Sequence, residues 1–122
     1  MQMKIFGKNG KMKINEFIQK YRKVEKLAPF MTRSYNPHVV CKDGFEMSVQ
    51  AGQSHYSTPR DVVDSYEDAE IGFPSAEESL IARYAENEEN LCDTVYGYVP
   101  CSIIDKVIEK HGGINEDAIN VE

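Results

Sequence analysis

The sequence contains no tryptophan and only three cysteines among its 122 residues. Cys41, Cys92 and Cys101 are odd in number and widely spaced, which does not fit the framework of a small disulfide-rich domain. No apolar run approaches the roughly 20 residues that span a bilayer, and the first residues lack the apolar stretch of a signal peptide. We therefore expect a cytoplasmic protein with reduced thiols and no membrane contact.

The motifs of common enzymes and metal sites are also absent. There is no G-x-S-x-G, H-E-x-x-H or dinucleotide-binding pattern, and segment 7–11 has glycines and lysines without phosphate-loop spacing, so a turn is expected there. The nearest pair of metal ligands, His38 and Cys41, is expected on opposite faces of a hairpin. Cys92 lies among acidic residues that disfavour a thiolate nucleophile, and Cys101 has no histidine near it in the sequence. We expect no enzymatic activity, no metal and no other cofactor.

Positive charge is scarce in most of the chain. Residues 1–33 hold nine Lys or Arg against two acidic residues, whereas residues 34–122 hold five against eighteen, so the segment charges of +7 and −13 give the net −6. A field of this sign repels phosphates, and direct binding to nucleic acid is therefore not expected. The acidic part of the chain suits a basic partner instead.

The length and the 41% share of hydrophobic residues fit one folded domain over residues 1–122. Its elements are expected to be a basic amphipathic helix over 14–28, a hairpin over 38–51, a strand over 69–73, a short helix opened by the capping box 75–78, a strand over 94–99 and a final helix over 102–111. The order α-β-β-β-α-β-α predicts an α+β fold, with three helices on one face of a mostly antiparallel four-stranded sheet. Residues 38–114 would form the core, and the acidic tail over 115–122 would be frayed.

The hairpin is the clearest local signal. Asp43-Gly44 lies between two runs rich in β-formers and favours a two-residue type I′ turn. That turn would pair Val40 with Met47 and would direct Cys41 to the opposite face. In the later strand 94–99, the same alternation places Tyr96 and Tyr98 together on the outer face.

A polar and aromatic cluster is a candidate for recognition, because Arg and Tyr combine large contact area with directional hydrogen bonds. As a nucleotide site it would use tyrosines for stacking and arginines for phosphate. The residues expected in such a site are His55, Tyr56, Arg60, Arg83, Tyr96 and Tyr98. Alternatively, Tyr96 and Tyr98 would only cover the outer face of the sheet.

Five segments occur in order along the chain: VCKDGFEMSVQAG (40–52), HYSTPR (55–60), EIGFPS (70–75), TVYGYVP (94–100) and IEKHGG (108–113). Together they resemble a family of small, mostly uncharacterised proteins encoded by bacteriophages and prophages. The resemblance covers residues 38–114 and implies no catalytic residues. It implies a genetic context in which small accessory proteins counter host defence.

The first functional hypothesis is therefore an anti-defence inhibitor, similar to anti-CRISPR proteins, that binds a host effector through an acidic surface. A CRISPR effector nuclease holds nucleic acid in positively charged channels, which such a surface would fit. The residues expected to contact the partner are Asp64, Glu67, Asp68, Glu70, Glu86, Glu88, Glu89 and Asp93. The alternatives are a binder that sequesters a nucleotide defence signal and a phage accessory structural protein.

A homodimer is also expected. If all helices covered one sheet face, Tyr96 and Tyr98 would lie beside Val39 and Cys41 on the other face, forming an exposed apolar patch. A self-complementary patch of this kind closes after one twofold pairing.

Overall fold

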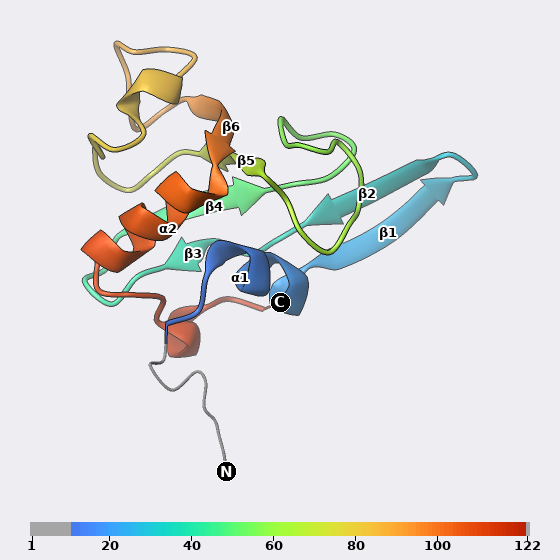
Figure 1. Ribbon diagram of the computed structural model, residues 1–122, viewed down its shortest axis with the longest axis horizontal. Coiled ribbons are helices and arrows are strands. Elements are labelled where there is room, and N and C mark those ends of the chain that lie inside the picture. Colours follow the sequence, from blue (N-terminus) through green and yellow to red (C-terminus); the bar gives the residue numbers. More distant parts are fainter. Residues whose placement is uncertain (1–10, 122) are drawn as a thin grey trace.

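The computed structural model describes residues 11–121 (Figure 1). The elements in chain order are α1 (Ile14–Tyr21), β1 (Lys23–Ala28), β2 (Met31–Tyr35), β3 (Val39–Val40), β4 (Glu46–Gln50), β5 (Asp68–Gly72), the 3₁₀ helix η1 (Ala82–Tyr84), β6 (Val95–Pro100), α2 (Cys101–Lys110) and the 3₁₀ helix η2 (Glu116–Ala118). The α+β class is confirmed. The prediction of three helices on a single four-stranded sheet is wrong. Residues 11–121 form two α-helices and two antiparallel sheets, β1-β2 and β3-β4-β5-β6. The turn expected at 7–11 lies outside the described residues except for Lys11.

The core lies between one face of the four-stranded sheet and the two α-helices. Alternate residues of the strands and every third or fourth residue of the helices point inward, and each fully buried aliphatic side chain contributes about 1.5–3 kcal/mol. Large hydrophobic side chains of this core, none more than 1% exposed, include Phe17, Ile18, Met47, Val49, Ile71, Tyr96 and Ile104. The opposite face of β4 and β5 remains polar and partly exposed.

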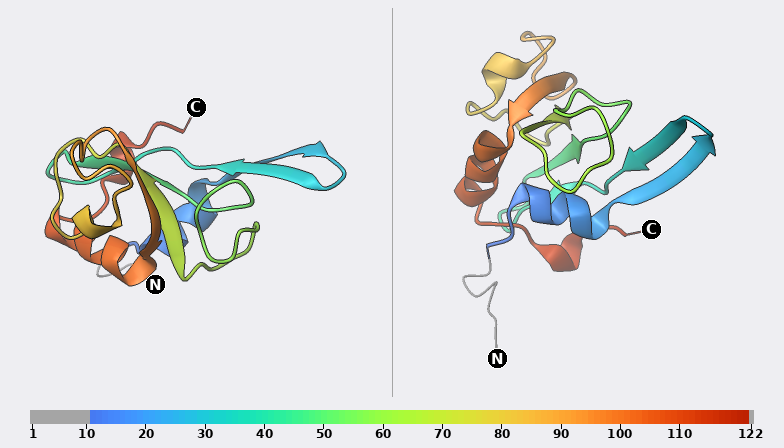
Figure 2. Two further views of the ribbon diagram at one scale, coloured as in Figure 1. Left: turned by 90° about the horizontal axis from the view of Figure 1, so that it is seen from above. Right: turned by 45° about the vertical axis from the view of Figure 1, so that its right-hand side comes forward.

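The helix expected over 14–28 ends at Tyr21. Arg22 leaves it with an extended backbone (φ −64°, ψ 135°), and the chain then forms β1, reverses and returns as β2. Val24 and Ala28 fit helical spacing as well as a strand, so their periodicity did not locate the helix end. The two strands form an arm that extends away from the remainder of the molecule, as Figures 1 and 2 show.

The short helix expected after Ser75 does not form either, and turns with η1 replace it. The Ser75 hydroxyl accepts the N–H of Glu46 (2.9 Å), so it binds the neighbouring strand rather than a helix end. The Glu78 side chain turns into the protein and is only 1% exposed. Ser75 and Glu78 therefore have the spacing of a capping box but make tertiary contacts instead of capping a helix.

The hairpin around Asp43-Gly44 is present, but its loop holds three residues. The N–H of Gly44 donates to the carbonyl of Cys41 (2.9 Å), and the N–H of Cys41 donates to the carbonyl of Phe45 (2.8 Å). Gly44 has a φ of +97°, which glycine adopts without steric cost. This is a turn with a bulge rather than the expected two-residue turn.

The longer loop shifts the hairpin register by one residue. Val39, rather than Val40, pairs with Met47. Since side chains alternate along a strand, this shift exchanges the two faces. Val39 and Cys41 are consequently buried and His38 is exposed, which corrects the expected arrangement.

Strand β6 contains a bulge that alters its faces. Gly97 and Tyr98 together stand opposite Glu70 of β5, and Tyr98 adopts a left-handed backbone with φ +53°. The bulge resets the alternation, so Tyr96 and Val99 are both fully buried. The expected pairing of the two tyrosines on one outer face is wrong, and the apolar patch proposed for a homodimer is not formed.

Residues 115–121, expected to be frayed, pack against the body. Ile119 is only 9% exposed, and Lys20 of α1 forms an ion pair with Glu116 (2.7 Å). Gly112 ends α2 with φ +92°, as the sequence indicated.

Candidate functional site

The arm formed by β1, β2 and the turn between them is the most exposed apolar feature of the described chain. Its tip residue Phe30 is 97% exposed, and Leu27 and Met31 beside it are 51% and 56% exposed. Val24 and Tyr35 nearer the body are also exposed. Exposed apolar side chains gathered on one projecting segment are typical of an interaction site.

Hydrogen bonds along β2 fix the arm to the body. Ser34 donates its hydroxyl to the carbonyl of Ala51 (3.0 Å), and the N–H of Thr32 donates to the side chain of Gln53 (3.0 Å). The His55 ring lies 3.0 Å from the carbonyl of Ser34 through Nε2. The strands therefore leave the body at a defined position, although a two-stranded hairpin alone is at best marginally stable.

The charge of the arm is opposite to that of most of the chain. Residues 23–35 contain Lys23, Lys26 and Arg33 against Glu25, which gives a net charge of +2. Arg33 and Glu25 face each other across the strands at 3.6 Å. The arm thus combines exposed apolar side chains with a small positive excess.

The eight acidic residues expected to contact a partner form two groups. The first group is Asp64, Glu67, Asp68 and Glu70, and the second is Glu86, Glu88, Glu89 and Asp93. Because β5 and β6 are antiparallel and the second group directly precedes β6, the groups lie at opposite ends of this strand pair. None of the eight forms an ion pair with a Lys, Arg or His among residues 11–121. The structure therefore holds two acidic surfaces rather than one.

Three of the residues expected in a nucleotide site do lie together. Tyr56 and Tyr98 have ring centroids 5.8 Å apart, and the Arg60 guanidinium lies 5.4 Å from the Tyr56 ring. The N–H of Tyr98 donates to the carbonyl of Tyr56, and the N–H of Tyr56 donates to Glu70. The cluster offers two aromatic faces but one cation, with a carboxylate beside it.

The other three expected residues lie elsewhere. The His55 ring bonds to the arm, as described above. Tyr96 is fully buried and donates its hydroxyl to the carbonyl of Leu91. Arg83 lies over the Tyr84 ring (5.7 Å) in η1. The six residues therefore do not form one nucleotide site.

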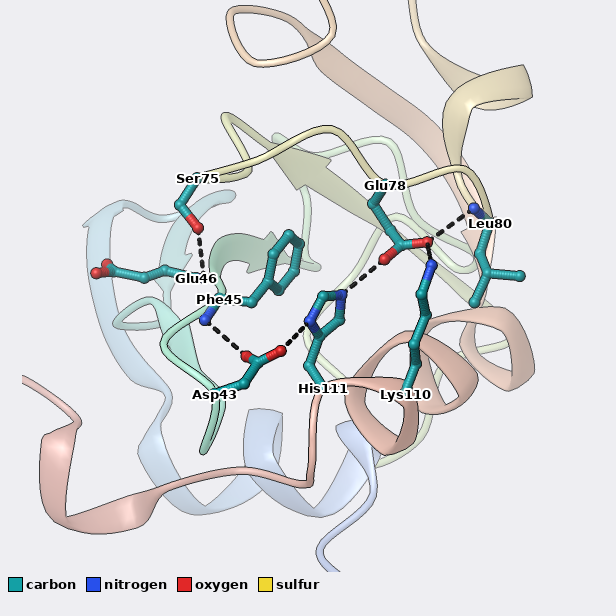
Figure 3. A network of polar contacts seen from close by, with 8 residues as sticks. All are labelled: Asp43, Phe45, Glu46, Ser75, Glu78, Leu80, Lys110 and His111. Carbon is teal, nitrogen blue, oxygen red and sulfur yellow. Dashed lines mark hydrogen bonds and ion pairs between the residues drawn. The ribbon is translucent and has the colours of Figure 1, made fainter.

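His111 is the centre of a polar network that the sequence did not indicate (Figure 3). Its Nδ1 lies 2.6 Å from Asp43 Oδ2 and its Nε2 lies 2.7 Å from Glu78 Oε1. Lys110 donates to the other oxygen of Glu78 (2.8 Å), and the Phe45 ring stacks on the imidazole with centroids 4.1 Å apart. Since ionised carboxylates only accept hydrogen bonds, this geometry favours the protonated imidazole, in which both ring nitrogens donate.

The pKa values of this network follow from its geometry. Burial alone would lower the pKa of His111, but its hydrogen bonds to Glu78 and Asp43 outweigh burial and raise the pKa. Burial raises the pKa of Glu78, yet bonds from Lys110, the Leu80 N–H and His111 bring it below its usual range. The network is a closed set of mutually satisfied charges, so we assign it a structural role.

The buried thiols are poor nucleophiles. Burial raises the pKa of Cys41 to about 11 and that of Cys101 to about 12, with Asp43 and Asp105 adding to the respective shifts. All three cysteines are free. Among residues 11–121 we find no group of three or more His, Cys, Asp or Glu side chains arranged to hold a metal ion.

No helix within the described part of the chain has the length and apolar character needed to cross a membrane. Comparisons of the chain with family models, curated proteins and solved structures found no match. The function must therefore be argued from the surfaces of this structure.

Proposed function

We propose that this protein is a non-enzymatic binding protein that docks on another protein through its arm. One observation carries this proposal: Phe30, at 97% exposure, stands at the tip of an arm whose base is hydrogen-bonded to the body. Exposing an aromatic side chain in this way is unfavourable in the free protein and becomes favourable when a partner covers it. Aromatic anchors of this kind dominate the energy of many interfaces.

The chemistry of the arm favours a protein partner. The arm carries only a small positive excess on a chain of net charge −6, so long-range repulsion opposes binding to a phosphate backbone. The arm instead fits an apolar groove with acidic residues at its rim. There Phe30, Leu27 and Met31 would fill the groove, while Lys26 would contact the rim.

A host defence protein is the class of partner that we propose to test first, because such a partner is what the expected resemblance to phage-encoded proteins implies. The protein would inhibit this partner by occupying a site that the defence protein needs for its activity. The direct assay adds the purified chain to a Cas9-type effector with its guide and measures cleavage of target DNA. The cytoplasm of the host cell would be the compartment for this role.

The acidic loop over 86–93 supports a second candidate. Glu86, Glu88, Glu89 and Asp93 are exposed and lack an ion pair with the described residues, so they present unneutralised charge. A basic channel of a nucleic-acid-binding protein would neutralise them, and added salt would weaken that contact strongly. In this candidate the loop, rather than the arm, would make the first contact.

Site-specific photo-crosslinking distinguishes the two candidates. We would replace Phe30, Glu88 or Gln19 one at a time with benzoylphenylalanine in the full chain, produced in cells of its native host. Gln19 is exposed on α1, outside both surfaces, and serves as the control. We expect one discrete adduct with another protein from position 30 and none from position 19. An adduct from position 88 alone would favour the acidic loop, and equal labelling at all three positions would contradict both candidates.

A further inference from the structure

A cavity of about 460 Å³ lies beside α2, outside the surfaces described so far. Four lysines line it from three parts of the chain: Lys11 and Lys13 before α1, Lys42 in the hairpin loop and Lys106 on α2. Its volume falls in the range of small-molecule sites, which is roughly 300–1,000 Å³. Four lysines on the wall of one cavity are unexpected in a chain of net charge −6.

The acidic residues of the cavity neutralise these lysines only in part. Glu109 lies 3.6 Å from Lys11 and pairs with it alone. The Oδ1 of Asp105 accepts the N–H of Ile14 (2.7 Å) at the start of α1, and its carboxylate also attracts Lys13 without forming an ion pair with it. Two acidic residues thus stand against four lysines on the cavity wall.

Three of the lysines form no ion pair within the described residues. No carboxylate oxygen lies within ion-pair distance of Lys13, Lys42 or Lys106. An anion in the cavity would be attracted by the lysines that line it. The excess of lysines over acidic residues on the cavity wall therefore suits an anionic ligand.

The chain after α2 packs closely against the hairpin loop at the cavity. Gly112 has φ +92°, and a Cβ atom at this position would lie 3.3 Å from the Cβ of Lys42. A side chain at Gly112 would thus press on the hairpin loop that holds Lys42. Met12 and Ile108 add apolar surface to the same wall.

We infer that this cavity binds a phosphate-bearing small molecule, with Lys13, Lys42 and Lys106 on the phosphates. A nucleoside polyphosphate fits it best, because the apolar surface of Met12 and Ile108 would contact the base while the ammonium groups contact the phosphates. Inorganic polyphosphate shares the anionic chemistry and is the other source of such a ligand. This site is separate from the arm and does not depend on the proposed function.

Calorimetry with the full chain tests the inference. We would titrate ATP, inorganic tripolyphosphate and adenosine into the protein and into three variants, Lys42→Glu, Lys106→Glu and Lys26→Glu. Lys26 lies on the arm and, like Lys42 and Lys106, is exposed, so all three variants change the net charge equally. Circular dichroism and the unfolding midpoint of each variant show whether it remains folded.

We expect both polyanions to bind, adenosine alone not to bind, and each cavity variant to weaken binding about tenfold or more. Lys26→Glu should change the affinity for the polyanions less than about twofold, because it reverses a charge on the arm, outside the cavity. Tighter binding of ATP than of tripolyphosphate would assign a nucleotide, and equal binding would assign inorganic polyphosphate. Absence of heat with both polyanions at millimolar concentration would overturn the inference, as would equal weakening by Lys26→Glu.

Discussion

The imidazole of His111 lies 2.7 Å from the carboxylate of Glu78, although 33 residues separate them in the sequence. The same ring contacts Asp43, 68 residues away, from its other nitrogen. One side chain at the end of α2 therefore joins the hairpin loop and the segment before η1 to the helix. Glu78 is 1% exposed, so this junction is closed to solvent on one side.

The network makes stability depend on pH. The pKa of His111 is raised in the folded protein, so the folded state binds more protons than the unfolded state near and above pH 6.5. The stabilisation is complete below the pKa of the unfolded chain and is lost as the pH rises through the folded pKa. Urea unfolding at pH 6, 7 and 8 should give a falling free energy of unfolding, and His111→Gln should flatten that slope. A free energy that rises with pH would contradict this.

Removing the buried carboxylate should be costly. Glu78→Gln leaves His111 and Lys110 without their charged partner, and we expect a loss of about 2–4 kcal/mol in the free energy of unfolding. Glu77→Gln is the matched control, because Glu77 is the neighbouring residue and its side chain is exposed. This variant should change the free energy of unfolding by less than about 0.5 kcal/mol. Equal effects of the two changes in chemical denaturation would show that the network does not stabilise the fold.

Gly52 should not tolerate a side chain. A Cβ atom at this position would lie 2.1 Å from Ser34 Oγ, and the φ of +151° already disfavours other residues. We expect Gly52→Ala to lower the free energy of unfolding by about 2–4 kcal/mol. Ser34→Ala in the same chain removes the clash, so the double variant should be more stable than the sum of the single effects. Strict additivity in a double-mutant cycle would exclude the contact.

The exposed residue Phe73 is held in a left-handed backbone with φ +48°. Glycine relieves this conformation, whereas alanine retains it. Phe73→Gly should therefore be more stable than Phe73→Ala by about 1 kcal/mol, since both variants lose the same ring. Thermal unfolding of the pair measures the difference, and a more stable alanine variant would contradict the backbone assignment.

The regular core was predictable because its apolar periodicity is strong. Met47 and Val49 alternate in β4, and Ile104, Val107 and Ile108 recur at helical spacing in α2. Burial on one face of each element maintains that pattern. These positions are all buried in the structure.

The arm and the His111 network were not predictable from the sequence, for different reasons. The arm buries none of the side chains of β1, so no core pattern distinguished this strand from a continued helix. Glu78 has the spacing of a capping residue, and its use as a buried carboxylate depends on His111 and Lys110 from a distant segment. A loop one residue longer than expected reversed the faces at Val39 and Cys41, which local propensity does not determine.

The central claim is tested most directly by measuring how tightly two matched variants bind the partner that crosslinking captures. Phe30→Ser removes the aromatic tip of the arm, and Phe73→Ser removes an exposed phenylalanine outside it. Calorimetry with the purified partner should show binding weakened about tenfold to a hundredfold by Phe30→Ser, the loss of a central aromatic anchor, and changed less than about twofold by Phe73→Ser. Unchanged affinity for Phe30→Ser, or equal losses for both variants, would contradict the assignment of the arm as the binding site.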